Sequence, residues 1–165
     1  MNAEDKDMCE TRKAVSRYRW LVFAIVLIVQ ASLVGARELS VQIAMQVLIE
    51  ANAVEFGGGE QFFEPTTVLA VKLLLRSPQA GEIFHEVYRR SFGAPGKVYA
   101  LIALERMGDP DFESLRKDFL ASDLKPVNYI NGCMATDGVK PREYLEGWLQ
   151  FARTYRGFSE ETPIK

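Results

Sequence analysis

The chain has 165 residues, a net charge of −2 and an isoelectric point near 5.6. Its basic residues are scattered along the sequence, which argues against a nucleic-acid binder, because such proteins concentrate lysine and arginine on one face. The two cysteines, Cys9 and Cys133, are too few for a domain held together by disulfides, so its stability must come from packing.

The first informative stretch is the apolar run Trp20–Ala36, which contains no charged residue. A membrane helix needs roughly 20 apolar residues and a signal-peptide core about 7–15, and this run falls between the two. Basic residues precede it within the leader of residues 1–19, and such a flank keeps the N-terminus cytoplasmic during insertion. We therefore expect a signal peptide or a single membrane anchor at 20–36, and an exported domain at 37–165.

The residues after the run favour its cleavage, whereas those before it favour its retention as a membrane anchor. Val34-Gly35-Ala36 offers the small residues that a signal peptidase requires, which favours cleavage after Ala36 and a soluble periplasmic, extracellular or lumenal product. The long and partly acidic leader favours a retained anchor, unless translation starts at Met8 instead of Met1. A retained segment would pack against a partner helix through its small residues. These are Ala31, Ser32 and Gly35. A buried core helix of a soluble protein is the remaining alternative.

Residues 37–165 suffice for one small domain with a single core. We predict a mostly α-helical domain of antiparallel hairpins with one short β-hairpin. Its first element, Glu38–Val54, has an apolar face at helical spacing, but the apolar residues between Val41 and Ile49 also alternate with period two, which leaves a strand as the alternative. Gly57-Gly58-Gly59 predicts a loop, because three glycines are costly to hold in a helix. They lack the spacing of a phosphate-binding loop.

Proline marks the start of each later helix, since its missing N–H costs nothing in a first turn. Gly108 stands where a left-handed C-terminal cap is expected. In the last helix we expect Trp148 to anchor the core. The predicted helices are Pro65–Arg76, Pro78–Ser91, Ala94 to the residue before Gly108, Pro110–Ala121 and Arg142–Arg156.

The third and fourth of these helices form a hairpin over the segment Tyr99-Ala100-Leu101-Ile102-Ala103-Leu104-Glu105-Arg106-Met107-Gly108-Asp109-Pro110-Asp111. So short a turn makes the helices pack antiparallel. The segment resembles the helix-turn-helix core of HEAT-like repeats, over about one repeat, residues 97–120. The resemblance implies a helical hairpin that serves as a binding surface, and it implies no active-site residue, because such repeats share none. A solenoid needs about three repeats, and the earlier segments do not repeat the pattern.

Two short alternating runs, 127–130 and 133–136, flank Asn131-Gly132. This arrangement is the strongest short signal for a β-hairpin, with an irregular loop as the alternative because an isolated hairpin is barely stable. Asp137-Gly138 predicts a further turn of the chain. We expect the polar tail Phe158–Lys165 to be frayed.

His85 is the only histidine, which excludes metal sites built on two imidazoles. It follows Glu82 at the spacing of helical di-iron sites, but the sequence lacks the second motif that such sites require. We therefore predict no metal and no cofactor, and expect His85 to hydrogen-bond a neighbouring glutamate. Cys133 and His85 are the one nucleophile and base that the residue types allow, which makes an exported cysteine hydrolase an alternative. The orienting group would be Asn128, Asn131 or Asp137.

The main functional hypothesis is a non-catalytic protein-interaction domain of the cell envelope or secretory pathway. The candidate interaction residues lie beside the predicted helical hairpin and carry aromatic side chains. They are Tyr88, Tyr99 and Phe112. The alternatives are the cysteine hydrolase and an accessory subunit of a membrane complex, held in the bilayer by Trp20–Ala36. The partner would be a protein, not a nucleic acid.

Overall fold

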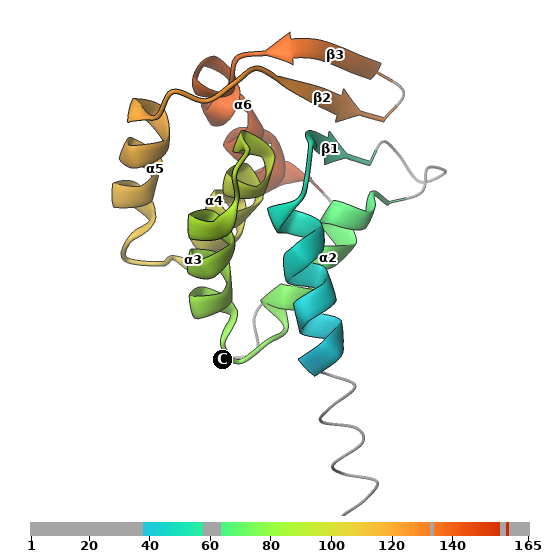
Figure 1. Ribbon diagram of the computed structural model, residues 1–165, viewed down its shortest axis with the longest axis vertical. Helices are drawn as coiled ribbons and strands as arrows, with labels where there is room; N and C mark the ends of the chain where they lie inside the picture. The colour runs from blue at the N-terminus through green and yellow to red at the C-terminus, as the bar shows by residue number, and fades with distance from the viewer. Residues whose placement is uncertain (1–37, 58–63, 133, 156–157, 159–165) are drawn as a thin grey trace, which may run out of the picture. The chain divides into compact units, whose positions relative to one another are not determined.

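The computed structural model describes residues 38–57, 64–132, 134–155 and 158 (Figure 1). The chain divides into two compact units, Met1–Ser40 and Val41–Lys165. The apolar run Trp20–Ala36 and the cysteine Cys133 lie outside the described residues.

The described residues are mostly helical, with one small sheet, as the sequence predicts. A helix occupies residues 38–49, so the strand alternative for this stretch is wrong. The predicted helix Glu38–Val54 is nevertheless too long, because a strand begins at Ala53. The remaining helices are α2 (Thr66–Leu75), α3 (Ala80–Arg90), α4 (Ala94–Met107), α5 (Phe112–Ala121) and α6 (Pro141–Thr154).

The ends of α4 show how local sequence sets these boundaries. Pro95 lies in the first turn, as expected. At the other end Gly108 adopts the left-handed conformation with φ of 67°, and its N–H donates to Glu105 O at 3.0 Å. The N–H of Asp109 donates to Leu104 O at 3.0 Å, which completes a Schellman motif. The predicted glycine cap is confirmed. By contrast, α3 begins two residues after the predicted Pro78, because residues 77–79 form a turn.

The sheet contains three strands in the order β1-β2-β3. β2 (Val127–Asn131) and β3 (Met134–Val139) pair antiparallel, and Gly132 at their turn has a φ of 60°. The Asn-Gly hairpin is confirmed. The turn expected at Asp137-Gly138 is wrong, because both residues lie inside β3. There β3 has one more residue than β2 between paired positions, and Gly138, at φ of 69°, accommodates this bulge.

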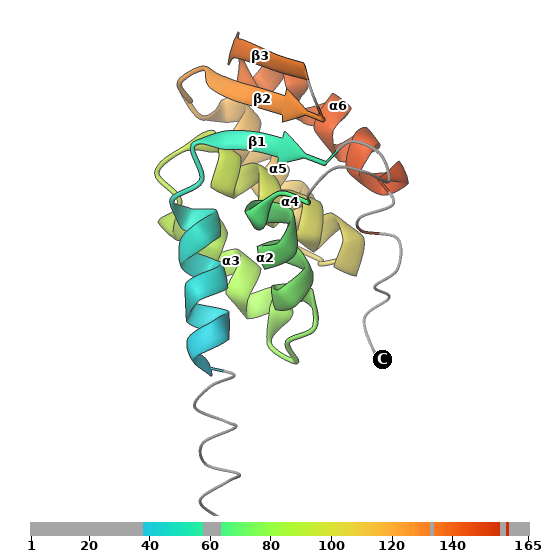
Figure 2. The ribbon, with the colours of Figure 1, turned by 90° about the vertical axis from the view of Figure 1, so that its right-hand side faces the viewer.

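β1 (Ala53–Phe56) is the strand that the sequence does not reveal. It pairs parallel with β2, and the N–H of Gly132 donates to Phe56 O at 3.0 Å. Figures 1 and 2 show β1 as the strand nearest to α2 and the 38–49 helix, with β3 at the far edge. The hairpin is therefore not isolated, since its inner strand is paired on both sides.

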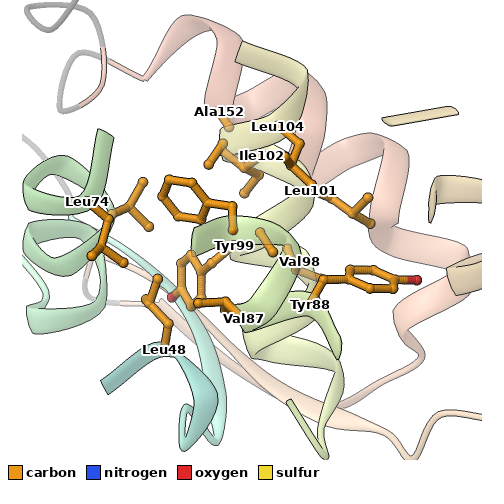
Figure 3. Close-up of a cluster of buried hydrophobic side chains, with 14 of the residues drawn as sticks. Leu48, Leu74, Val87, Tyr88, Val98, Tyr99, Leu101, Ile102, Leu104 and Ala152 are labelled. Carbon is orange, nitrogen blue, oxygen red and sulfur yellow. The ribbon is translucent and has the colours of Figure 1, made fainter. Parts of the chain in front are cut away.

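Helix α4 forms the centre of the domain. Every residue from Ala94 to Leu104 is buried except the partly exposed Lys97. The helix contacts α2, α3, α5, α6 and β1. A helix that is apolar on all sides belongs in the middle of a core. In Figure 3 the ring of Tyr99 lies between Leu48 of the 38–49 helix and Leu74 of α2.

The hydroxyl of Tyr99 ties this central helix to the edge of the sheet. It accepts a hydrogen bond from the backbone N–H of Glu55 at 2.7 Å and donates to the carbonyl oxygen of Glu55 at 3.1 Å. Both of these backbone groups belong to Glu55 of β1, a short strand of 4 residues. The tyrosine therefore fixes the position of β1 against the helices.

We predict that Tyr99→Phe lowers the free energy of unfolding by about 1–3 kcal/mol at neutral pH, because it leaves two buried backbone groups unpaired. Burial also raises the pKa of Tyr99 above the usual value. The unfolded chain then loses the phenolic proton above pH ~10 while the folded protein keeps it, so stability falls by about 1.4 kcal/mol per pH unit there. Urea unfolding at pH 7 and above pH 10 tests both points. If the stability of Tyr99→Phe fell above pH ~10 as steeply as that of the original protein, the predicted contribution of the Tyr99 pKa would be contradicted.

Helix α6 and the chain after it close the other side of the core. Trp148 is buried, as predicted, and so are Leu145 and Leu149, whereas Tyr144 is exposed. The side chain of Phe158 is buried and its ring centroid lies 5.4 Å from that of Tyr155. The expectation of a frayed tail is therefore wrong for Phe158. Aromatic packing holds this residue in place, and the rest of the tail lies outside the described residues.

Candidate functional site

The structure places all three predicted interaction residues in the interior. Tyr88, Tyr99 and Phe112 are buried, so their contacts are made within this chain. The hydroxyl of Tyr88 lies 2.9 Å from both Leu115 O and Asp118 Oδ2, and it donates its proton to one of these acceptors. Tyr88 thus joins α3 to α5. Tyr99 joins α4 to β1 in the same way.

The surroundings of Tyr88 raise its pKa, as those of Tyr99 do. Burial, followed by the carboxylate of Asp118, raises the pKa of Tyr88 above its usual value. The ammonium group of Lys97 lies 4.8 Å from the centroid of the same ring. A cation over an aromatic face adds a modest attraction, about 0.5–1 kcal/mol at exposed sites. The neutral phenol therefore persists at physiological pH and serves as a structural link.

Cys133, the proposed nucleophile of the hydrolase alternative, lies outside the described residues. Its proposed base, His85, lies on α3 and is partly exposed. The orienting candidates Asn128 and Asn131 lie on β2, and Asp137 lies on β3. Within the described residues, the His85 side chain hydrogen-bonds Asp109 and none of these three. A triad through His85 stays an untested prediction.

His85 contacts a residue that the sequence argument did not consider. Its Nε2 atom lies 3.2 Å from Oδ1 and 3.3 Å from Oδ2 of Asp109, in the turn after α4. The expected glutamate partner on its own helix is therefore wrong. Asp109 is held in place because its Oδ1 accepts the backbone N–H of Asp111 at 2.9 Å. The signal for this pairing was weak, since 24 residues separate the two side chains.

Together with Asp111, these residues form a cluster of possible metal ligands. One ligand atom each from His85, Asp109 and Asp111 can be chosen so that all three lie within 4.8 Å of one another. Asp109 and His85 are partly buried, whereas Asp111 is exposed. Among the residues described, this is the one such group of three or more histidine, cysteine or acidic side chains. It unites α3 with the α4–α5 turn.

A second candidate is the set of large apolar side chains that remain exposed. Three of them lie on two helices that run side by side in Figures 1 and 2: Ile43 on the 38–49 helix, and Leu69 and Leu73 on α2. Their exposed fractions are 56%, 50% and 39%. We refer to these three as the exposed trio. Phe92, in the loop between α3 and α4, is 98% exposed. The full set is Leu39, Ile43, Leu69, Leu73, Phe92, Met134 and Tyr144.

The membrane segment expected at Trp20–Ala36 is not among the residues that the structure describes. Within the described part of the chain, no helix combines the length and the apolar character that a membrane crossing requires.

Comparison of the chain with protein families, with characterised proteins and with solved structures finds no match.

Proposed function

We propose that the protein is a non-catalytic interaction domain on the exported side of a membrane, where it docks a partner protein through the exposed trio. One observation carries the proposal: Ile43, Leu69 and Leu73 lie exposed on helices whose other faces pack in the core. Burying a fully exposed aliphatic side chain of this size gains about 1.5–3 kcal/mol. A partner that covers the trio would gain a substantial part of its binding free energy there.

The residues beside Ile43 on the 38–49 helix favour a protein over a lipid surface, whereas α2 carries Lys72, which is paired with Glu64, and ends at the exposed Arg76. Helices that lie on bilayers carry lysine and arginine on their polar face. Residues 38–50 contain neither, and the exposed polar residues there include Gln42, Gln46 and Glu50. The expected occupant is therefore an apolar helix face of a partner protein, flanked by residues that can pair with Glu50.

The short connection to the apolar run favours an accessory subunit of a membrane complex. The chain from Ala36 to Ile43 spans at most about 25 Å even when fully extended. If Trp20–Ala36 stays in the bilayer, Ile43 cannot be far from its surface. The partner is then itself a membrane protein whose helix emerges beside the anchor.

Photo-crosslinking in native membranes tests the docking surface. A photoreactive amino acid placed at Ile43 or Leu69 of the full-length protein should give one crosslinked product of discrete mass. The same amino acid at Arg89 or Glu113, which are exposed on α3 and α5, should give none. Adducts to lipid alone, a product of twice the protein's mass, or no product at Ile43 and Leu69 would each overturn the proposal.

A charge placed in the trio supplies the matching prediction. Leu73→Glu in the protein that carries the crosslinker at Leu69 should abolish the product, because the partner's apolar face would have to bury a carboxylate. Since Leu73 is 39% exposed, the free energy of unfolding should change by no more than about 0.5–1 kcal/mol. Urea unfolding separates the two effects. A product that survives Leu73→Glu would contradict the assignment of the surface.

The mass of the protein recovered from membrane and soluble fractions tests the location. A full-length species in the membrane fraction supports the anchored subunit. A soluble species that begins at Arg37 would instead show a released domain, and the partner would then have to be sought in the exported space.

A further inference from the structure

We propose that His85, Asp109 and Asp111 bind a divalent transition-metal ion, with Zn²⁺ as the best fit. The inference is independent of the docking proposal, since none of the exposed trio takes part. An imidazole nitrogen and carboxylate oxygens are ligands that Zn²⁺ takes in proteins. Here the imidazole comes from α3 and the carboxylates from the turn between α4 and α5. The three candidate ligand atoms lie within 4.8 Å of one another.

The first two ligands lie close enough to share an ion. His85 Nε2 lies 3.2 and 3.3 Å from the two carboxylate oxygens of Asp109. Two ligands bonded at about 2.0–2.1 Å to one tetrahedral ion lie about 3.3–3.4 Å apart. An ion would therefore replace the direct contact between His85 and Asp109 without a large movement of either side chain.

The charges of the cluster also call for a cation. Among the described residues, the one ion-pairing partner of Asp109 is His85, and Asp111 has none. With a neutral imidazole the cluster carries two negative charges, which a divalent ion would balance. Asp109 is positioned by the N–H of Asp111, which its Oδ1 accepts, and its Oδ2 keeps lone pairs for a metal. The exposed side chain of Asp111 makes no hydrogen bond in the described chain and can turn toward the ion.

The ligand set also indicates which metals would bind. An imidazole nitrogen favours zinc, cobalt, nickel and copper over magnesium and calcium, which prefer oxygen ligands alone. Three protein ligands leave one tetrahedral position for water. Because His85 and the aspartates belong to different elements, the bound ion would fasten α3 to the α4–α5 turn.

The test uses the full-length protein in detergent micelles, with an affinity tag that contains no histidine. Cys9→Ser and Cys133→Ser remove both thiols, so that a cysteine site cannot imitate the result. Titration with Co²⁺ alone, followed by its visible absorption, should show one ion bound per chain, and Zn²⁺ should displace it. Both His85→Ala and Asp111→Asn should weaken binding at least about tenfold. Glu82→Gln, an exposed carboxylate on the same helix as His85, should leave binding unchanged.

Thermal unfolding provides a second measurement and a check on folding. Excess Zn²⁺ should raise the melting temperature of the thiol-free protein and of the Glu82→Gln control, and should raise that of Asp111→Asn, whose side chain is exposed, by clearly less. Absence of Co²⁺ and Zn²⁺ binding would overturn the proposal. Binding that survives His85→Ala, or that Glu82→Gln weakens as much as Asp111→Asn does, would overturn it too.

Discussion

Trp148→Ala should lower the free energy of unfolding by about 3–5 kcal/mol, a large fraction of the stability of a domain of this size. The indole of Trp148 is 1% exposed and lies between α6 and the sheet. Its ring centroid is 5.9 Å from that of Tyr129 on β2 and 6.0 Å from that of Tyr144. Removing it leaves a cavity that these neighbours cannot fill without moving β2. The cost therefore includes both the lost burial of apolar surface and the free energy of the cavity left behind.

The matched variant Trp148→Phe separates volume from hydrogen bonding. The buried indole Nε1 has no hydrogen-bond partner among the described residues. Phenylalanine removes that unpaired donor while keeping most of the apolar ring, so its cost should be well below half that of alanine. Urea unfolding of the full-length proteins, followed by circular dichroism, measures both. If phenylalanine cost as much as alanine, the lost apolar volume would not explain the cost and the packing argument would fail.

Several features of the fold could be predicted because they depend on local sequence. The left-handed cap at Gly108 needs a residue without Cβ, and Asn131-Gly132 supplies the turn that joins β2 to β3. Each signal lies within a few residues of the structure it specifies. The buried stripe of α3, with Phe84 and Val87, follows from helical periodicity in the same way.

β1 could not be predicted, since it is fixed by partners far away in the sequence. Its register pairs Val54 with Tyr129 and Phe56 with Asn131. Ala53–Phe56 is too short to show a pattern of its own, and its hydrogen bonds to Tyr99 come from a different helix. In contrast, the residues from Val41 to Ile49 alternate as a strand would but are helical, because the 38–49 helix buries Ala44, Met45 and Leu48 on one face.

The candidate sites show the same difference between what local sequence reveals and what depends on partners far away in the chain. Tyr88 and Tyr99 are interaction candidates in the sequence because they are aromatic residues beside the helical hairpin, yet each hydroxyl lies at a backbone acceptor inside the domain. His85 was expected to use a carboxylate on its own helix, the one neighbour that a sequence can identify. The turn that follows α4 supplies Asp109 instead. The contacts that these residues make depend on tertiary packing, which the sequence does not reveal.

Gly96→Ala should destabilise the protein by about 1–3 kcal/mol or more, although alanine is the better helix former. A Cβ at this position in the first turn of α4 would lie 2.5 Å from the carbonyl oxygen of Leu48 and 2.2 Å from Oγ of Ser91. The hydroxyl of Ser91 donates to Val87 O at 2.7 Å, so moving it would strain that bond. Leu48 O is backbone and can yield only if the 38–49 helix shifts.

Gly147→Ala is the matched control, because this glycine lies inside α6 and an added Cβ would meet nothing within 4 Å. There the same substitution should raise the free energy of unfolding by about 0.5–1 kcal/mol through helix propensity alone. Urea unfolding of the two variants should therefore give changes of opposite sign. Equal changes at both positions would show that α4 and the 38–49 helix are not in close contact at Gly96. Opposite signs would support close packing at Gly96, where Ser91 and Leu48, on the helix that carries Ile43, both approach the centre of the core.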